Sequence, residues 1–123
     1  MKIRSHKELD TYKLAFASSM EIFELTRKFP KEELYSLTDQ IRRSSRSVCA
    51  NLAEAFRKRK YPKSFVAKLS DSEGEAAESQ VWIDYALACK YIDKETHETL
   101  IAKYENILGK LVNMSLHPEK WSY

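Results

Sequence analysis

The sequence predicts an all-α protein: an antiparallel up-and-down four-helix bundle that forms a single domain over residues 1–123. Two observations lead to this prediction. The chain contains only 2 glycines and 3 prolines, far fewer than turn-rich folds require. Its apolar residues recur every three to four positions along four long segments, which is the period of a helix. Short connections between such segments make neighbouring helices run in opposite directions.

The first helix is expected over residues 6–28. Ser5 and Glu8 have the spacing of a capping box, in which each side chain satisfies a backbone amide of the first turn. The helix should end at Phe29, because a residue that precedes proline is pushed out of the helical region. Large apolar residues follow one another at three- and four-residue steps, and we expect this stripe to face the core: Leu9, Tyr12, Phe16, Met20 and Phe23.

The second helix is expected over residues 31–58. Tyr61-Pro62 ends it, and Pro62 is well placed as the first residue of the next helix. Its apolar stripe is close to a heptad repeat, which is typical of helices that pack at low crossing angles. The members of this stripe are Leu34, Leu37, Ile41, Ser45, Val48, Leu52 and Phe56.

The third helix is expected over residues 62–90, with a core face formed by Phe65, Leu69, Ala76, Ile83 and Leu87. Gly74 interrupts this helix at a cost of about 1 kcal/mol relative to alanine, so it is either tolerated strain or a point of close approach by another helix. The fourth helix is expected over residues 94–116, after Asp93 as N-cap. We expect the tail from His117 to be frayed or docked on a partner. The core face of the fourth helix comprises Leu100, Tyr104, Ile107, Leu111 and Met114.

A second, polar row follows the helix expected over residues 31–58. Its members are spaced i, i+4, i+8 and i+11 and therefore lie nearly above one another. Small residues lie along or beside the row, at Ser44, Ser47 and Ala55. The row is either a solvated face or a contact between protomers, and the small side chains favour the contact. The residues predicted for an oligomer interface are Arg43, Ser47, Asn51, Glu54 and, from the acidic cluster of the third helix, Glu78.

The positive charge is concentrated in one segment. Residues 42–63 carry eight cations and one acid, in a chain whose total charge is +3. Cations that meet phosphates release counterions and give salt-dependent affinity for nucleic acid, and an exposed tyrosine can stack on an unpaired base. The alternative is a solubilising turn that complements a helix C-terminus. The residues predicted to bind nucleic acid are Arg57, Lys58, Arg59, Lys60, Tyr61 and Lys63.

The sequence contains no catalytic or cofactor-binding motif, so we expect no enzyme activity, no cofactor and no metal. None of the three histidines follows a glutamate at the spacing used by di-iron bundles. Zinc-protease, C-x-x-C, Walker and dinucleotide motifs are also absent from the sequence. Cys49 and Cys89 lie among apolar residues and are expected to be reduced core cysteines. With neither a secretory signal nor an apolar span in the sequence, we expect a cytoplasmic location.

Five motifs follow one another along the chain: Phe29-Pro30, Gln40-Ile41-Arg42-Arg43-Ser44-Ser45, Ser47-Val48, Asn51-Leu52-Ala53-Glu54, and Glu78 to Ala86 with Cys89 and Tyr91-Ile92. In order and spacing they resemble the 23S rRNA-intervening sequence protein family of four-helix bundles, and the resemblance covers about residues 8–114. It implies a homopentameric barrel, and kinship with the accessory variability determinant of diversity-generating retroelements, which binds nucleic acid and a reverse transcriptase. It also implies assembly roles for Arg43, Asn51 and Glu54. Ala55 departs from the glycine that usually follows the fourth motif.

Two functions remain open at this stage. The first is a non-enzymatic homo-oligomer, pentameric by resemblance, that binds RNA or single-stranded nucleic acid through its basic face. A ring would repeat the basic segment on every subunit, and weak contacts would then add through avidity. The alternative is a protein–protein adaptor or scaffold with no nucleic-acid role.

Overall fold

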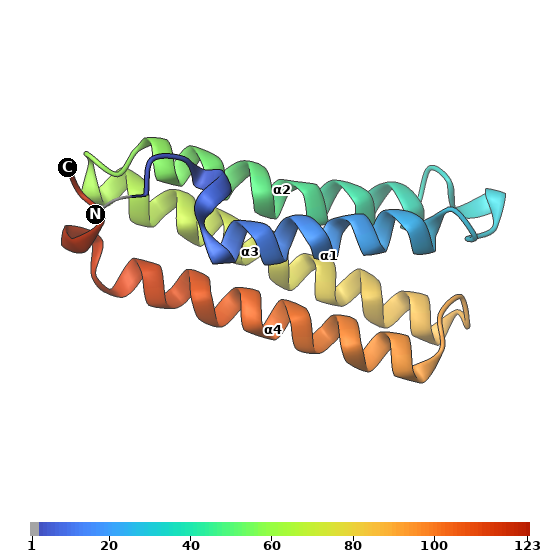
Figure 1. Ribbon diagram of the computed structural model, residues 1–123. Helices are drawn as coiled ribbons and strands as arrows, with labels where there is room; N and C mark the ends of the chain where they lie inside the picture. Colours follow the sequence, from blue (N-terminus) through green and yellow to red (C-terminus); the bar gives the residue numbers. More distant parts are fainter. Residues whose placement is uncertain (1–2) are drawn as a thin grey trace.

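The computed structural model describes residues 3–123, and this part of the chain contains four α-helices and no strand. The helices are α1 (Asp10–Thr26), α2 (Leu37–Arg57), α3 (Pro62–Ala88) and α4 (Lys94–Leu116). They lie alongside one another, and the chain direction reverses from each helix to the next (Figure 1). Both ends of the described part, near residues 3 and 123, lie at the end of the bundle where α2 turns into α3. The predicted all-α four-helix bundle is confirmed.

The first two helices begin later than expected, because each is preceded by a short 3-10 turn. His6–Glu8 forms the first turn, and the predicted capping box is present at its start. The Glu8 carboxylate accepts hydrogen bonds from the Ser5 and Arg4 amides at 2.8 Å, and these bonds hold the pKa of Glu8 below its ordinary value. Lys31–Glu33 forms the second turn, and Ser36 then leaves the helical region with φ −128° and ψ −107°. The expected start of the second helix at residue 31 is therefore wrong.

The connection between α3 and α4 is a Schellman ending followed by an N-cap. Lys90 adopts a left-handed conformation with φ 65°. Its amide donates to the carbonyl of Leu87, and the Tyr91 amide donates to that of Ala86, both at 2.9 Å. These bonds end α3 two residues before the predicted boundary. The predicted cap at Asp93 is confirmed, since its carboxylate accepts a 2.7 Å hydrogen bond from the amide of Thr96.

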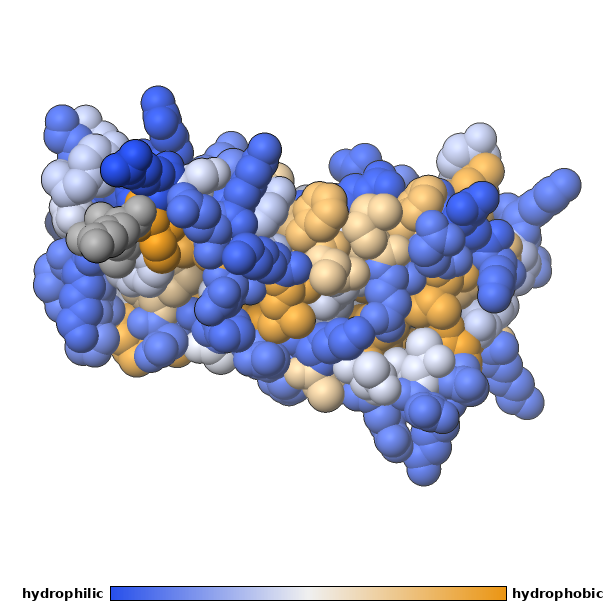
Figure 2. All heavy atoms as spheres, in the orientation of Figure 1, coloured by the Kyte–Doolittle hydropathy of each residue, from blue (hydrophilic) through white to orange (hydrophobic). Residues whose placement is uncertain are grey.

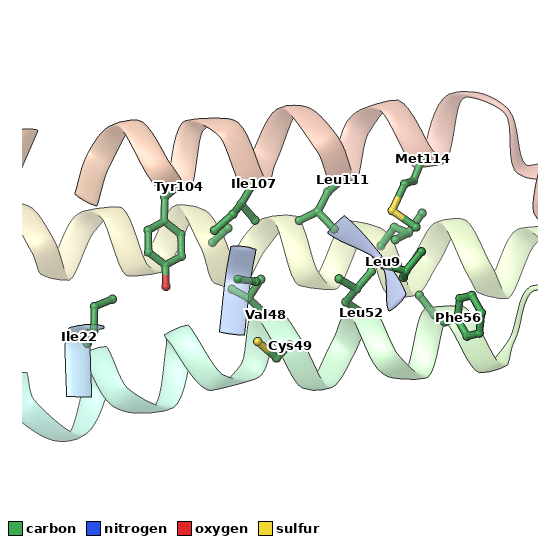
Figure 3. Packing of buried hydrophobic residues seen from close by; sticks show 14 of the residues in the cluster. Leu9, Ile22, Val48, Cys49, Leu52, Phe56, Tyr104, Ile107, Leu111 and Met114 are labelled. Atoms are coloured by element: carbon green, nitrogen blue, oxygen red, sulfur yellow. The ribbon is translucent and has the colours of Figure 1, made fainter. Parts of the chain in front are cut away.

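The predicted core faces of α2, α3 and α4 are largely confirmed. Figure 3 shows Tyr104, Ile107, Leu111 and Met114 pointing from α4 into the same core as Val48 and Leu52 of α2. Burying this apolar area is the main force that holds such a bundle together. Leu34 is the clearest exception, because it precedes α2 and is 46% exposed. Cys89 is also exposed, so its assignment to the core is wrong, whereas Cys49 is buried.

The predicted core stripe of the first helix is confirmed at Leu9, which is buried, and is wrong for its other four members. Phe16 and Met20 are 50% and 45% exposed, and Tyr12 and Phe23 are only half-buried. The face of α1 that meets the core carries smaller side chains instead, namely Thr11, Ala15, Ser18, Ser19, Ile22 and Thr26. Both stripes repeat with the helical period, so the period alone does not decide which of them faces inward.

Small residues bring α2 and α3 close together. The Ser44 and Ser79 hydroxyl oxygens lie 2.9 Å apart, and the Ser72 hydroxyl donates to the backbone carbonyl of Val48 at 2.7 Å. Ser44 takes part in this contact, and Ser44 and Ala55 are both fully buried within the single chain. Their assignment to a joint between protomers is therefore wrong, because they serve the packing within one chain.

The C-terminal tail packs on its own bundle. The ring of Trp121 lies 6.2 Å from that of Phe65, measured between centroids. The guanidinium carbon of Arg59 lies 4.7 Å from the centroid of the Tyr123 ring. The expectation of a frayed or partner-docked tail is wrong for these residues.

Candidate nucleic-acid interface

The predicted basic cluster lies at the end of the bundle where α2 gives way to α3. Arg57 is the last residue of α2, and Pro62 fixes the start of α3. Between them the chain makes a tight turn, closed by a 2.8 Å hydrogen bond from the Tyr61 amide to the Lys58 carbonyl. The cations therefore project in several directions. We use the term basic end for the exposed cations Arg4, Arg57, Lys58, Lys60 and Lys63, together with Tyr61, which is 61% exposed.

Arg59 differs from the other cations of the cluster. Its guanidinium carbon lies 3.7 Å from the centroid of the Phe56 ring and 4.7 Å from that of Tyr123. A guanidinium over an aromatic face is held by its attraction to the ring. Its Nη1 also donates to the carbonyl of Ile3 at 3.4 Å. Arg59 therefore contacts Phe56 of α2, Ile3 near the start of the chain and Tyr123 in the C-terminal tail.

A hollow of about 450 Å³ opens beside Arg59. The N-terminal segment supplies Arg4, Ser5 and His6 to its wall, and the tail supplies Tyr123. The end of α2 provides the remaining wall, namely Ala53, Glu54, Phe56, Arg57 and Arg59. Sequence reasoning missed the contribution of the two chain ends, because their position next to the α2–α3 turn follows only from the direction of the helices. We call this cavity the arginine hollow.

The predicted polar row lies on the side of α2 that faces α3. The Asn51 amide donates to the carbonyl of Ser47 at 3.0 Å and accepts from Lys68 of α3 at 3.5 Å. Glu54 forms an ion pair with the same lysine at 3.0 Å, and this contact raises the pKa of Lys68. Arg43 is exposed at the other end of the row. The row is thus partly tied to its own chain and partly open.

Glu78, the last predicted interface residue, lies on α3. Its carboxylate accepts a 3.1 Å hydrogen bond from the indole nitrogen of Trp82. Nearby, burial raises the pKa of Glu75, and the negative charges of Glu78 and Asp71 raise it further. These acids form a partly buried acidic face along α3.

An apolar groove between α1 and α2 was not predicted. It measures about 370 Å³ and contains the large α1 side chains that the core does not use. Figure 2 shows apolar side chains gathered over the middle of the molecule, in the region where Figure 1 shows α1 running just below α2. The groove is lined by Tyr12, Phe16, Ser19, Met20, Arg46, Cys49, Ala50 and Ala53. The sequence feature that marks this groove is the large apolar stripe of the first helix, which we had predicted to face the core.

Comparison with known proteins identifies the family. Residues 7–113 match the family model described as 23S rRNA-intervening sequence protein. This chain belongs to the 23S rRNA-intervening sequence protein family.

One solved structure supports the fold of this family member. It is that of a protein of unknown function from the S23 ribosomal protein family of Bacteroides thetaiotaomicron. The two chains are 24% identical, the match covers 85% of this chain and 94% of the other, and the TM-score is 0.77. At this level of identity the likeness establishes the fold alone. No curated protein matches the chain.

The remaining ionisable groups include a pair between two helices and a buried thiol. Within residues 3–123, no three histidine, cysteine or acidic side chains are grouped as metal ligands would be. His97 of α4 pairs with Asp84 of α3 at 2.7 Å. Its acidic neighbours in the sequence, Glu95 and Glu98, are not its partners in this contact. Burial raises the pKa of the Cys49 thiol to about 11, which keeps it in the unreactive protonated form. In this same part of the chain, no helix has an apolar stretch long enough to cross a bilayer.

Proposed function

We propose that this protein is a non-enzymatic homo-oligomer that binds RNA or another single-stranded nucleic acid through its basic end. The observation that carries the proposal is the grouping of unpaired cations around an exposed tyrosine. Arg57, Lys58, Lys60 and Lys63 are exposed, and among residues 3–123 none of them forms an ion pair. Cations without internal partners are free to neutralise phosphates.

Tyr61 adds a second kind of contact to the basic end. It lies in the turn between the cations and is 61% exposed. An aromatic ring in this position can stack on an unpaired base, whereas the bases of a duplex are already stacked on one another. This combination favours single strands over duplexes as the ligand.

Two unlike surfaces on either side of α2 support the oligomeric part of the proposal. The polar row lies toward α3, and the apolar groove lies toward α1. A closed ring requires each subunit to meet its neighbour through two different surfaces, whereas a two-fold dimer uses the same surface twice. The proposal is therefore a ring, and the family resemblance favours five subunits. We place it in the cytoplasm, where the free thiols of Cys49 and Cys89 stay reduced.

The nucleic-acid part is tested with a charge variant and a matched control. The variant replaces Arg57, Lys58, Lys60 and Lys63 by glutamine and leaves the structural Arg59 in place. The control replaces four exposed lysines at the opposite end of the bundle by glutamine, namely Lys28, Lys31, Lys90 and Lys94. We expect the variant to lose most of its affinity for a fluorescent single-stranded RNA and the control to keep it. Equal affinity in the two proteins would refute the assignment of the basic end.

The oligomeric part is tested by native mass spectrometry and light scattering. We expect Met20→Lys in the groove and Arg43→Glu in the row each to shift the mass toward the monomer. Both residues are exposed, so the single chain should still fold. Lys13→Gln, on the exposed face of α1, serves as the control. A wild-type protein that is monomeric at tens of micromolar would end the ring proposal.

A hollow at the other end of the molecule favours the alternative, a protein–protein adaptor. It measures about 470 Å³ and is lined by Tyr35, Trp82 and Tyr85, among other residues. Tyr35 is 91% exposed, and exposed aromatic residues are enriched at protein interfaces. A partner that stays bound after nuclease treatment and is lost with Tyr85→Ala would favour the adaptor over the nucleic-acid binder.

A further inference from the structure

Three arginines line the arginine hollow, and their guanidinium groups have no carboxylate partner among residues 3–123. Arg4 and Arg57 are exposed at its rim, and Arg59 lies against its aromatic wall. The one carboxylate side chain among the lining residues, that of Glu54, is paired with Lys68 at 3.0 Å. The hollow therefore presents a surplus of positive charge.

Arg59 is under-satisfied as a hydrogen-bond donor. A guanidinium has five N–H groups, yet Arg59 makes one hydrogen bond in the described chain, the 3.4 Å contact to Ile3. Its Nε is buried with no acceptor. Buried donors in folded proteins nearly always have a partner, so an unsatisfied one calls for an explanation such as an absent ion or ligand. Because Nε is buried, an anion in the hollow would meet the Nη groups of this guanidinium, which share the single contact to Ile3.

The shape and lining of the hollow favour one kind of anion. Its wall combines arginine side chains with the aromatic rings of Phe56 and Tyr123. Arginine binds phosphate oxygens through pairs of parallel hydrogen bonds, and the ring of Tyr123, which is 71% exposed, offers a surface on which a base can stack. A phosphate group joined to a nucleoside matches both parts of this lining.

We propose that the arginine hollow binds the terminal phosphomonoester of a nucleic-acid strand, and this inference rests on the proposed nucleic-acid function. A terminal phosphomonoester carries a charge of about −1.5 to −2 at pH 7, whereas each phosphodiester within a strand carries −1. It therefore gains more from several unpaired guanidiniums. A strand end also needs only one opening to the solvent, while an internal phosphate must enter and leave with the chain on both sides.

The test compares three single-stranded RNAs of the same sequence: one with a 5′ phosphate, one with a 3′ phosphate and one with hydroxyls at both ends. Each carries an internal fluorophore, and its affinity for the full-length protein is measured by anisotropy. We expect one of the two phosphorylated strands to bind about tenfold more tightly than the strand without a terminal phosphate. The two phosphorylated strands show which end the hollow recognises.

Two variants separate the hollow from the rest of the basic end. Arg4→Gln/Arg57→Gln should reduce the preference for the terminal phosphate to about twofold or less, with the helical circular dichroism unchanged. Lys60→Gln/Lys63→Gln should weaken the binding of all three strands by similar factors and keep the preference. Equal affinity of the wild-type protein for the three strands would overturn the inference and leave the proposed function standing. Failure of the wild-type protein to bind any strand would overturn both.

Discussion

The hydroxyl of Tyr104 offers a direct test of the packing. Tyr104 is fully buried, and Figure 3 shows its ring pointing from α4 toward α2, close to Ile22. Among residues 3–123, its hydroxyl oxygen has no hydrogen-bond partner. Burial raises the pKa of this hydroxyl well above its ordinary value, and the nearby Ser79 hydroxyl lowers it by less, so the group stays protonated. The Ser79 hydroxyl is therefore close to that of Tyr104, but the two do not meet hydrogen-bond geometry. Replacing Tyr104 by phenylalanine removes the hydroxyl and keeps the ring.

The expected effect of Tyr104→Phe is a gain in stability. An unsatisfied buried polar group costs about 1–3 kcal/mol, and the substitution removes that cost while leaving the apolar contacts of the ring in place. At the low end of this range the free energy of unfolding rises by about 1 kcal/mol. An unfolding entropy of about 2.1 cal/mol/K per residue, taken over 123 residues, converts this gain into a rise in Tm of about 4 °C.

Thermal unfolding followed by circular dichroism measures the change, with both proteins at the same concentration because assembly makes Tm depend on concentration. Tyr91→Phe is the control. The Tyr91 hydroxyl donates to Glu33 at 2.8 Å, and this contact raises the pKa of Tyr91 to about 12, so its loss should lower Tm. A decrease in stability for Tyr104→Phe of 1 kcal/mol or more would mean that the hydroxyl has a partner in the folded protein, and it would refute the reasoning.

Three further substitutions test single features of the fold, each by thermal unfolding. Gly74→Ala should stabilise the protein by about 0.5–1 kcal/mol, because a methyl group at this position meets no other atom within 4 Å; a loss of stability or of assembly would reveal a close neighbour there. Lys90→Gly should also stabilise it, since Lys90 holds the left-handed φ of 65° that favours glycine, and no gain would mean that the strain is relieved in another way. Arg59→Gln should destabilise it by about 1–2 kcal/mol through the lost contact with the Phe56 ring, whereas Arg57→Gln should have little effect. Equal effects of these two arginine variants would contradict the structural role of Arg59.

Much of the fold could be predicted from the sequence because its signals are local. The period of Ile41, Val48 and Leu52 depends on one helix only, and the cap at Asp93 depends on four consecutive residues. The proline at position 62 likewise marks a helix start without help from the rest of the chain. Each of these predictions is confirmed by the structure.

The predictions that failed depend on how the helices face one another. In α1, large residues such as Phe16 and small ones such as Ala15 repeat with the same period, and their burial depends on the side chains that the other helices send into the core. Among the described residues, Tyr104 from α4 is the largest fully buried side chain. Ser44 was assigned to the wrong contact for a similar reason. A small residue indicates that another helix packs closely, but it does not show which helix that is.

The candidate site was only partly predictable. The run from Arg57 to Lys60 is visible in the sequence, but the hollow beside it also needs Arg4 and Tyr123 from the two ends of the chain. The sequence also could not show that Arg59 is the cation that turns inward, because this depends on the positions of Phe56 and Tyr123 around it.

The dependence of nucleic-acid affinity on salt tests most directly whether the basic end meets phosphates. Each cation that meets a single-stranded phosphate contributes about −0.7 to the slope of log affinity against log salt concentration. If Arg57, Lys58, Lys60 and Lys63 of one subunit engage the strand, the slope is about −3 and the affinity falls about 50-fold between 50 and 200 mM salt. Several engaged subunits make the slope steeper. An affinity for single-stranded RNA that stays constant over this range would contradict the proposal.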